Sequence, residues 1–119
     1  MVIDELKGLP GPLIKWFLDT IGTEGVCRMA DMTTTRRATA QVGIGYCDGN
    51  GFQAFIGESK GHIADRPAGT RGFGWDSTFI QDGWDNTRAE LSENDYAKAS
   101  IRKIALDALK SYLQHENTH

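Results

Sequence analysis

Cysteine and histidine are scarce in this chain. Its 119 residues include two cysteines, Cys27 and Cys47, and three scattered histidines. The cysteines have neither the close spacing of a metal-binding motif nor the number needed for a disulfide framework. We therefore expect reduced thiols in a cytoplasmic protein.

Basic residues and long apolar runs are lacking too. Lys and Arg number 13 against 16 Asp and Glu, a net charge of -3, so we expect no nucleic-acid partner despite the pair Arg36-Arg37. No apolar stretch approaches the length of a membrane span, and the N-terminus has no signal-peptide pattern, so we expect no membrane association. The composition, 39% hydrophobic and 24% charged, is typical of a globular protein, and residues 1–119 are expected to form a single domain.

The first third of the chain predicts helices. Pro12 suits the first turn of a helix that extends to about Ile21, because its missing N–H costs nothing there. Gly22 is placed to end that helix in a left-handed conformation. A second short helix is expected from Glu24 to Ala30.

The middle of the chain predicts strands. Alternating apolar residues favour a strand over 33–46, and Asp48-Gly49-Asn50-Gly51 is a typical hairpin turn before a partner strand over 52–60. Residues 61–64 suggest either a further short strand or an edge continuation of the preceding strand after a glycine bulge, and 77–80 suggest another strand.

The last element is predicted to be one long amphipathic helix. Ser92 can cap it, and it is expected from Glu93 to about Gln114. Apolar residues recur at helical spacing: Ile101, Ile104, Ala105, Ala108, Leu109, Tyr112 and Leu113. The expected fold is α+β, with a curved, mostly antiparallel sheet flanked by an N-terminal helix and this long C-terminal helix.

The glycine-rich stretch over 69–79 is the strongest candidate for a functional site. Three glycines within six residues permit close backbone approaches, and Phe73, Trp75 and Asp76 follow at once. Aromatic faces and an adjacent carboxylate suit a planar, polar ring such as a nucleobase. The alternative is a tight turn whose aromatic residues fill a core, and the residues alone leave both interpretations open.

The order of several short motifs along the chain resembles the inosine triphosphate pyrophosphatase family. The matching segments are Gly8-Leu9-Pro10-Gly11-Pro12, Ile14-Lys15-Trp16-Phe17-Leu18, Gly61-His62-Ile63-Ala64, Pro67-x-Gly69, Gly72-Phe73-Gly74-Trp75-Asp76-x-x-Phe79, Thr87-x-Ala89-Glu90-Leu91 and Ser100-x-Arg102. These enzymes hydrolyse non-standard purine nucleoside triphosphates to the monophosphate and pyrophosphate. The resemblance covers nearly the whole chain.

The resemblance implies a purine-nucleotide site. Phe73 and Trp75 would flank the purine around Gly74, and Asp76 would lie at the base and ribose end. Arg102 would donate to the six-position oxygen of the purine, and Ser100 would support that turn.

The chain departs from the family pattern at several positions. Tyr96 stands where the family has a lysine, Ala97 where it has an asparagine, Ile101 where it has a histidine, and Ala68 where it has an arginine. The front portion of the family fold, with its phosphate loop and acidic catalytic residues, is also expected to be absent.

Pyrophosphate release requires carboxylates that hold Mg²⁺. The acidic residues Asp4, Glu5, Glu58, Asp65 and Glu90 show no spacing that fixes a metal site, so no metal ligand or catalytic residue is assigned. Mg²⁺ is expected only if the chain is active.

Three hypotheses are compatible with the sequence. The chain binds a purine nucleotide with little or no catalysis, or it is an interaction scaffold. Alternatively, it is an active pyrophosphatase whose metal site is rebuilt across a homodimer or from Asp4, Glu5, Asp65 or Glu90. A homodimer is expected in each case, with Trp16, Phe17 and the strand edges as candidates for its interface.

Overall fold

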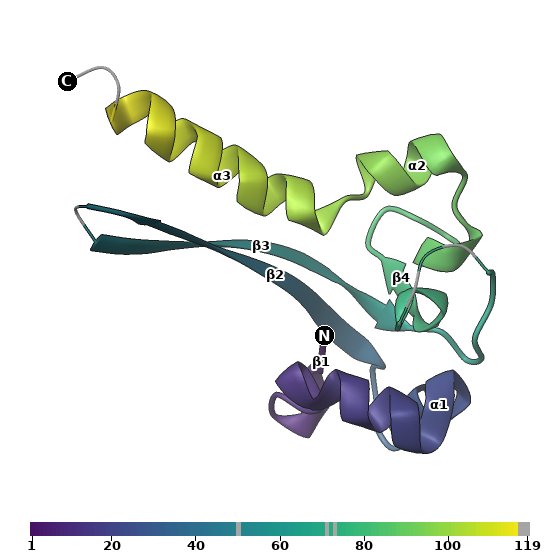
Figure 1. Cartoon of the computed structure of the whole chain (residues 1–119). Helices are drawn as coiled ribbons and strands as arrows, with labels where there is room; N and C mark the ends of the chain where they lie inside the picture. Colours follow the sequence, from purple (N-terminus) through teal and green to yellow (C-terminus); the bar gives the residue numbers. More distant parts are fainter. Residues whose placement is uncertain (50, 71, 73, 117–119) are drawn as a thin grey trace. The chain divides into compact units, whose positions relative to one another are not determined.

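The computed structural model describes residues 1–49, 51–70, 72 and 74–116 (Figure 1). The chain divides into two compact units. The first unit comprises residues 1–40 and 59–99, and the second comprises residues 41–58 and 100–119. The single domain expected from the sequence stays a prediction.

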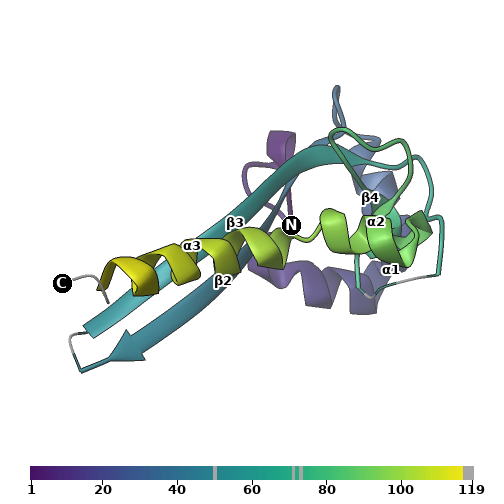
Figure 2. The same cartoon turned by 90° about the horizontal axis from the view of Figure 1, so that it is seen from above.

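In the described residues the sheet has four strands, in the order β1-β2-β3-β4. The strands are β1 (Val2–Ile3), β2 (Arg37–Asp48), β3 (Gly51–Ile63) and β4 (Phe79–Gln81). β1 pairs antiparallel with β2, and β3 pairs antiparallel with β4. Figure 2 shows β2 and β3 as two long neighbouring strands. The predicted α+β fold with an antiparallel sheet is confirmed.

β2 begins later than the predicted start at residue 33, because a turn precedes it. The backbone amide of Thr33 donates to the Ala30 carbonyl at 3.0 Å, and the Arg36 amide donates to Thr33 Oγ1 at 3.1 Å. Arg36 has a φ of 58°, which no strand residue adopts. The strand therefore starts at Arg37.

β3 continues through Gly61 without the predicted bulge. Gly61 pairs with Gln81 of β4, and a Cβ at this position would lie 2.1 Å from the Ile80 carbonyl oxygen. The glycine serves close strand packing instead.

The first helical region agrees with the prediction of two helices separated at Gly22. A short 3-10 turn η1 (Asp4–Leu6) follows β1, and a second, η2 (Gly11–Leu13), contains Pro12 and leads into α1 (Ile14–Ala30). Within α1, Gly22 has φ 70° and ψ -179°, so it breaks the helical geometry. Glycine adopts this positive φ without the steric cost that a side chain would bring.

The predicted single C-terminal helix is wrong: the structure has two helices. These are α2 (Glu93–Lys98) and α3 (Ile101–Glu116). The predicted cap is confirmed, because the Asp95 amide donates to Ser92 Oγ at 3.2 Å. The hydrogen bonds that separate the two helices belong to the candidate site.

The core of the first unit is built from the sheet and the second half of α1. Its fully buried apolar side chains include Ile3, Val26, Ala30, Ile63 and Phe79. Burial of such side chains supplies most of the stability of a domain of this size. This core fixes the end of β3 and the start of β4, between which the glycine-rich segment lies.

The second unit packs α3 against the β2–β3 hairpin. The Tyr112 ring lies 5.4 Å from the Phe55 ring and 6.2 Å from the Tyr46 ring. Part of the predicted apolar stripe on α3 remains uncovered, since Ile104 is 47% exposed. None of the helices in the described residues is long and apolar enough to cross a membrane.

Candidate functional site

Trp75 is held at the start of a short 3-10 turn, η3 (Asp76–Thr78). Its carbonyl accepts hydrogen bonds from the Thr78 amide at 2.9 Å and from Thr78 Oγ1 at 2.7 Å. Its ring meets the buried Phe79 ring edge-on, with centroids 5.5 Å apart. The indole is only partly buried, so it combines a fixed position with solvent access.

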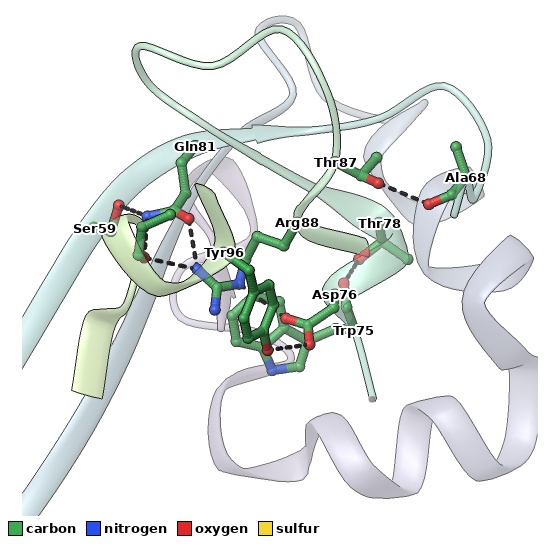
Figure 3. Close-up of polar contacts among 10 residues, drawn as sticks. Ser59, Ala68, Trp75, Asp76, Thr78, Gln81, Thr87, Arg88 and Tyr96 are labelled. Atoms are coloured by element: carbon green, nitrogen blue, oxygen red, sulfur yellow. Dashed lines mark hydrogen bonds and ion pairs between the residues drawn. The ribbon is translucent and has the colours of Figure 1, made fainter. Parts of the chain in front are cut away.

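The Asp76 carboxylate is buried and bonded through both oxygens (Figure 3). Arg88 Nε donates to Oδ1 at 2.9 Å, and the Tyr96 hydroxyl donates to Oδ2 at 2.9 Å. Gly72 approaches so closely that a Cβ there would lie 2.1 Å from Oδ2. Here the glycine leaves room for the carboxylate of the same loop, not only for a ligand.

Arg88 is the centre of this hydrogen-bond network and is 6% exposed. Besides Asp76, its Nη1 donates to Gln81 Oε1 at 2.5 Å and to the Ala99 carbonyl at 2.9 Å. The guanidinium lies 4.8 Å from the centroid of the Tyr96 ring and 5.9 Å from that of the Trp75 ring. A buried guanidinium with a carboxylate, two oxygen acceptors and two aromatic neighbours has its charge well compensated.

The 3-10 turn η4 (Arg88–Glu90) positions this arginine. Thr87 and Glu90 form a reciprocal capping box, in which the Thr87 amide donates to Glu90 Oε1 at 3.0 Å. Thr87 Oγ1 also donates to the Ala68 carbonyl at 2.7 Å, which ties the turn to the preceding loop. The motif Thr87-x-Ala89-Glu90 thus fixes the direction from which Arg88 reaches Asp76.

The Ala99 carbonyl explains why the C-terminal helix is interrupted. It accepts from Arg88 Nη1 and from Gln81 Nε2, the latter at 3.1 Å. In a continuous helix it would accept from the Lys103 amide. That amide instead donates to Ser100 Oγ at 3.1 Å, which begins α3 afresh.

Gln81 completes the network at the end of β4. Its Nε2 donates to Ser59 Oγ at 2.8 Å as well as to the Ala99 carbonyl. Among the described residues, no buried side-chain nitrogen or oxygen lacks a hydrogen-bond partner. The cluster is therefore preorganised by β3, β4, η3, η4 and α2.

The predicted site residues fall into three groups. Trp75 and Asp76 are brought together with the exposed Gly74 on one loop, whereas Phe73 lies outside the described residues. Ser100 and Arg102 belong to the second unit. There Ser100 caps α3, and Arg102 is exposed on its first turn.

Tyr96 and Ile101, two departures from the family pattern, have clear structural roles. Burial, followed by the hydrogen bond to Asp76, raises the pKa of Tyr96. Its hydroxyl therefore keeps its proton at neutral pH. Ile101 is 3% exposed and packs in the second unit as an apolar residue.

The candidate metal ligands do not form a magnesium site in the described part of the chain. Asp4 accepts from Thr39 Oγ1 at 3.1 Å, and Glu5 accepts from the Thr35 amide at 2.8 Å. Hydrogen bonds from the backbone of Thr35 and of Thr34 lower the pKa of Glu5. The other candidates also have separate partners. Glu58 accepts a hydrogen bond from Gln41, Asp65 lies within ion-pair distance of Arg36, and Glu90 belongs to its capping box.

No group of three or more His, Cys, Asp or Glu side chains within the described ranges converges as a metal site would require. In nucleotide sites Mg²⁺ is usually held by one or two carboxylates together with substrate phosphates. The acidic side chains Asp4, Glu5 and Glu90 are each engaged in a local hydrogen bond instead.

Sequence reasoning missed Arg88, which occupies the unassigned position of Thr87-x-Ala89-Glu90-Leu91. The Thr87-x-x-Glu90 capping box was a usable signal for a helical turn. The capping-box pattern does not reveal that the Arg88 side chain points inward and binds the carboxylate of Asp76, twelve residues earlier in the chain.

Comparison with known proteins agrees with this fold and with the order of motifs. The model of the Ham1 family matches residues 1–112. The chain belongs to the Ham1 family. A dITP/XTP pyrophosphatase of Pyrobaculum aerophilum is 38% identical over 117 residues, covering 98% of this chain and 63% of that protein. An inosine triphosphate pyrophosphatase of Schizosaccharomyces pombe is 36% identical, covering 93% of this chain and 60% of that protein.

Solved Ham1 structures share the fold. The Ham1 protein of Staphylococcus aureus superposes with a TM-score of 0.86 at 29% identity, covering 97% of this chain and 63% of that one. A HAM1 protein from Coxiella burnetii gives a TM-score of 0.82 at 25% identity, covering 96% and 63% respectively. The chain thus spans less than two-thirds of the length of these Ham1 relatives.

Proposed function

We propose that this chain binds a purine nucleoside triphosphate of the inosine or xanthosine type and hydrolyses it slowly or not at all. The observation that carries the proposal is the buried Asp76–Arg88–Tyr96 network, which holds a solvent-accessible Trp75 in a fixed position. An aromatic ring that is held in place is a good stacking surface for a base, because little entropy is lost on binding.

The relatives support the choice of ligand. Proteins at 36–38% identity are named dITP/XTP or inosine triphosphate pyrophosphatases, and this chain aligns with them along nearly its full length. The glycine-rich loop and η4 lie inside the matched region. Phe73, Gly74, Ser100 and Arg102 stay predictions from the sequence for nucleotide contacts.

Low catalysis is proposed because the carboxylates needed for a metal do not converge. Asp4, Glu5 and Glu90 each serve a separate local hydrogen bond in the first unit. Losing the groups that hold a catalytic metal removes orders of magnitude of rate.

The alternative is an active pyrophosphatase whose metal site forms across a homodimer. The similarity to named pyrophosphatases favours this alternative. It predicts pyrophosphate release from inosine or xanthosine triphosphate with Mg²⁺ or Mn²⁺. Release no faster than in a protein-free control removes the alternative and leaves the binding proposal.

A homodimer is part of both proposals. In the first unit Trp16 is 65% exposed and Leu13 is 47% exposed, an apolar surface that a partner would cover favourably. Light scattering at micromolar concentration should give twice the chain mass, and Trp16→Lys should reduce it. A wild-type chain of single mass under these conditions contradicts the dimer.

The binding proposal is tested by NMR on the three tryptophan indole N–H signals. Adding inosine triphosphate should shift the Trp75 signal, assigned by Trp75→Phe, while those of Trp16 and Trp84 serve as internal controls. Unchanged signals at millimolar nucleotide would contradict the proposal and favour an interaction scaffold. Equal movement of all three would indicate a nonspecific effect and also count against it.

A further inference from the structure

The Tyr96 hydroxyl is directed at Asp76, as Figure 3 shows, and this fixes its hydrogen-bonding character. A phenol has one proton to donate and lone pairs that accept. Its proton is committed to Asp76 Oδ2 at 2.9 Å, because the carboxylate is ion-paired with Arg88 and can only accept. Toward any further group, the Tyr96 oxygen is therefore an acceptor only.

The Tyr96 hydroxyl keeps this hydrogen-bonding role near neutral pH. Burial and the bond to Asp76 raise the pKa of Tyr96, so the hydroxyl does not ionise near neutral pH. Arg88 packs against the Tyr96 ring at 4.8 Å and keeps the ring in place. The side chain is nonetheless only partly buried, so a ligand can reach it.

Tyr96 also belongs to the same cluster as the proposed stacking surface. Arg88 contacts both rings, at 4.8 Å from the Tyr96 centroid and 5.9 Å from the Trp75 centroid. Proteins that stack a base on an aromatic ring commonly read its Watson–Crick edge with nearby polar groups. An acceptor next to Trp75 is suited to that task.

We propose that Tyr96 determines specificity by accepting a hydrogen bond from the N1–H group of a 6-oxopurine. The inference rests on the proposed nucleotide binding and deepens it. Hypoxanthine, xanthine and guanine carry a proton on N1, whereas adenine carries a lone pair there, which an acceptor repels. The lysine that the resemblance predicts at this position has only donors and could not accept a hydrogen bond from N1–H.

The experiment compares three ligands by calorimetry on the whole chain: inosine triphosphate, its 1-methyl derivative, and ATP. The 1-methyl derivative keeps the 6-oxo group but has no N1 proton. The wild type should bind inosine triphosphate about tenfold more tightly than the 1-methyl derivative, because the methyl group replaces the proton that the Tyr96 oxygen would accept. ATP should bind at least as weakly.

Tyr96→Phe keeps the ring and removes the acceptor, so the gap between the first two ligands should close. Tyr46→Phe is the matched control, because it removes a phenol from the second unit, and the gap should persist. Thermal unfolding verifies that both variants fold. If a variant does not fold, the comparison of the three ligands on the wild type still tests the proposal.

The outcomes separate the two proposals. Binding of inosine triphosphate with no preference over its 1-methyl derivative overturns the role of Tyr96 and leaves nucleotide binding intact. A preference for inosine triphosphate over its 1-methyl derivative that survives in Tyr96→Phe likewise overturns the role of Tyr96. No binding of any of the three nucleotides to the wild type overturns the proposed function itself.

Discussion

Asp76, Arg88 and Tyr96 act as one unit at the scale of single residues. Burying a carboxylate and a guanidinium costs free energy that their mutual attraction and further hydrogen bonds must offset. Arg88 meets this requirement with three acceptors, and Asp76 with two side-chain donors. In the proposed site Asp76 is thus a positioning residue, which holds Arg88 and Tyr96 beside Trp75.

Arg88→Met should destabilise the chain by about 3–5 kcal/mol, because it leaves the buried carboxylate of Asp76 without its cation. Urea unfolding followed by circular dichroism measures the change. Adding Asp76→Asn to Arg88→Met should recover part of the loss, since the uncompensated charge is then gone.

Arg37→Met is the matched control for that prediction. Arg37 forms a bidentate pair with Asp82 at 2.7 and 2.8 Å, but both side chains are substantially exposed. Solvent screens such a pair, so its loss should change stability little. Equal losses in Arg88→Met and Arg37→Met would contradict the importance assigned to burial.

The two cysteines should differ sharply in reactivity. Cys27 is 1% exposed, and burial raises the pKa of its thiol to about 11, whereas Cys47 is exposed. Because the thiolate is the reactive form, Cys27 should stay unmodified by iodoacetamide at pH 8 until the chain unfolds. Mass spectrometry with Cys47→Ser as control measures this, and rapid labelling of that variant would count against the buried position of Cys27.

The division between α2 and α3 shows how hydrogen bonds from distant residues decide where a helix ends. The apolar periodicity begins at Ile101, and the prediction extends that helix back to the Ser92 cap because no pattern over 93–100 marks a break. The break arises because Arg88 and Gln81 take the Ala99 carbonyl out of the helical ladder. Ser100 then caps the new helix, α3.

Local patterns predicted the elements that local chemistry controls. The helix pair around Gly22, the hairpin strands and the Ser92 cap arise from glycine, turn residues and capping residues near in sequence. The later start of β2, the straight passage of β3 through Gly61, and the place of Arg88 depend on contacts with distant residues. No single-sequence pattern contains those contacts.

Ser100→Ala should destabilise α3 by about 1 kcal/mol, because the Lys103 amide loses its cap. Ser111→Ala is the control, since Ser111 is exposed in the interior of the same helix and alanine favours helix there. Chemical denaturation should rank the control at or above the wild type. A helix-interior serine that matters as much as Ser100 would disprove the capping role.

At the scale of the whole molecule, the fold is that of a Ham1 protein over part of the length of its relatives. Its structure superposes on the Staphylococcus aureus Ham1 protein with a TM-score of 0.86 while spanning 63% of that chain. Family membership could be predicted from the sequence, because its motifs extend in order from Gly8 to Arg102. The proposal that the chain binds a nucleotide but hydrolyses it slowly or not at all is a statement about the whole molecule.

The most direct test of the account is calorimetric titration of the chain with inosine triphosphate in the presence of Mg²⁺, with Trp75→Ala as the matched variant. We predict saturable binding by the wild type and binding about 5- to 150-fold weaker by the variant, because stacking on one aromatic ring contributes about 1–3 kcal/mol. No heat of binding at millimolar nucleotide, or equal binding by both proteins, would contradict a nucleotide site built on Trp75.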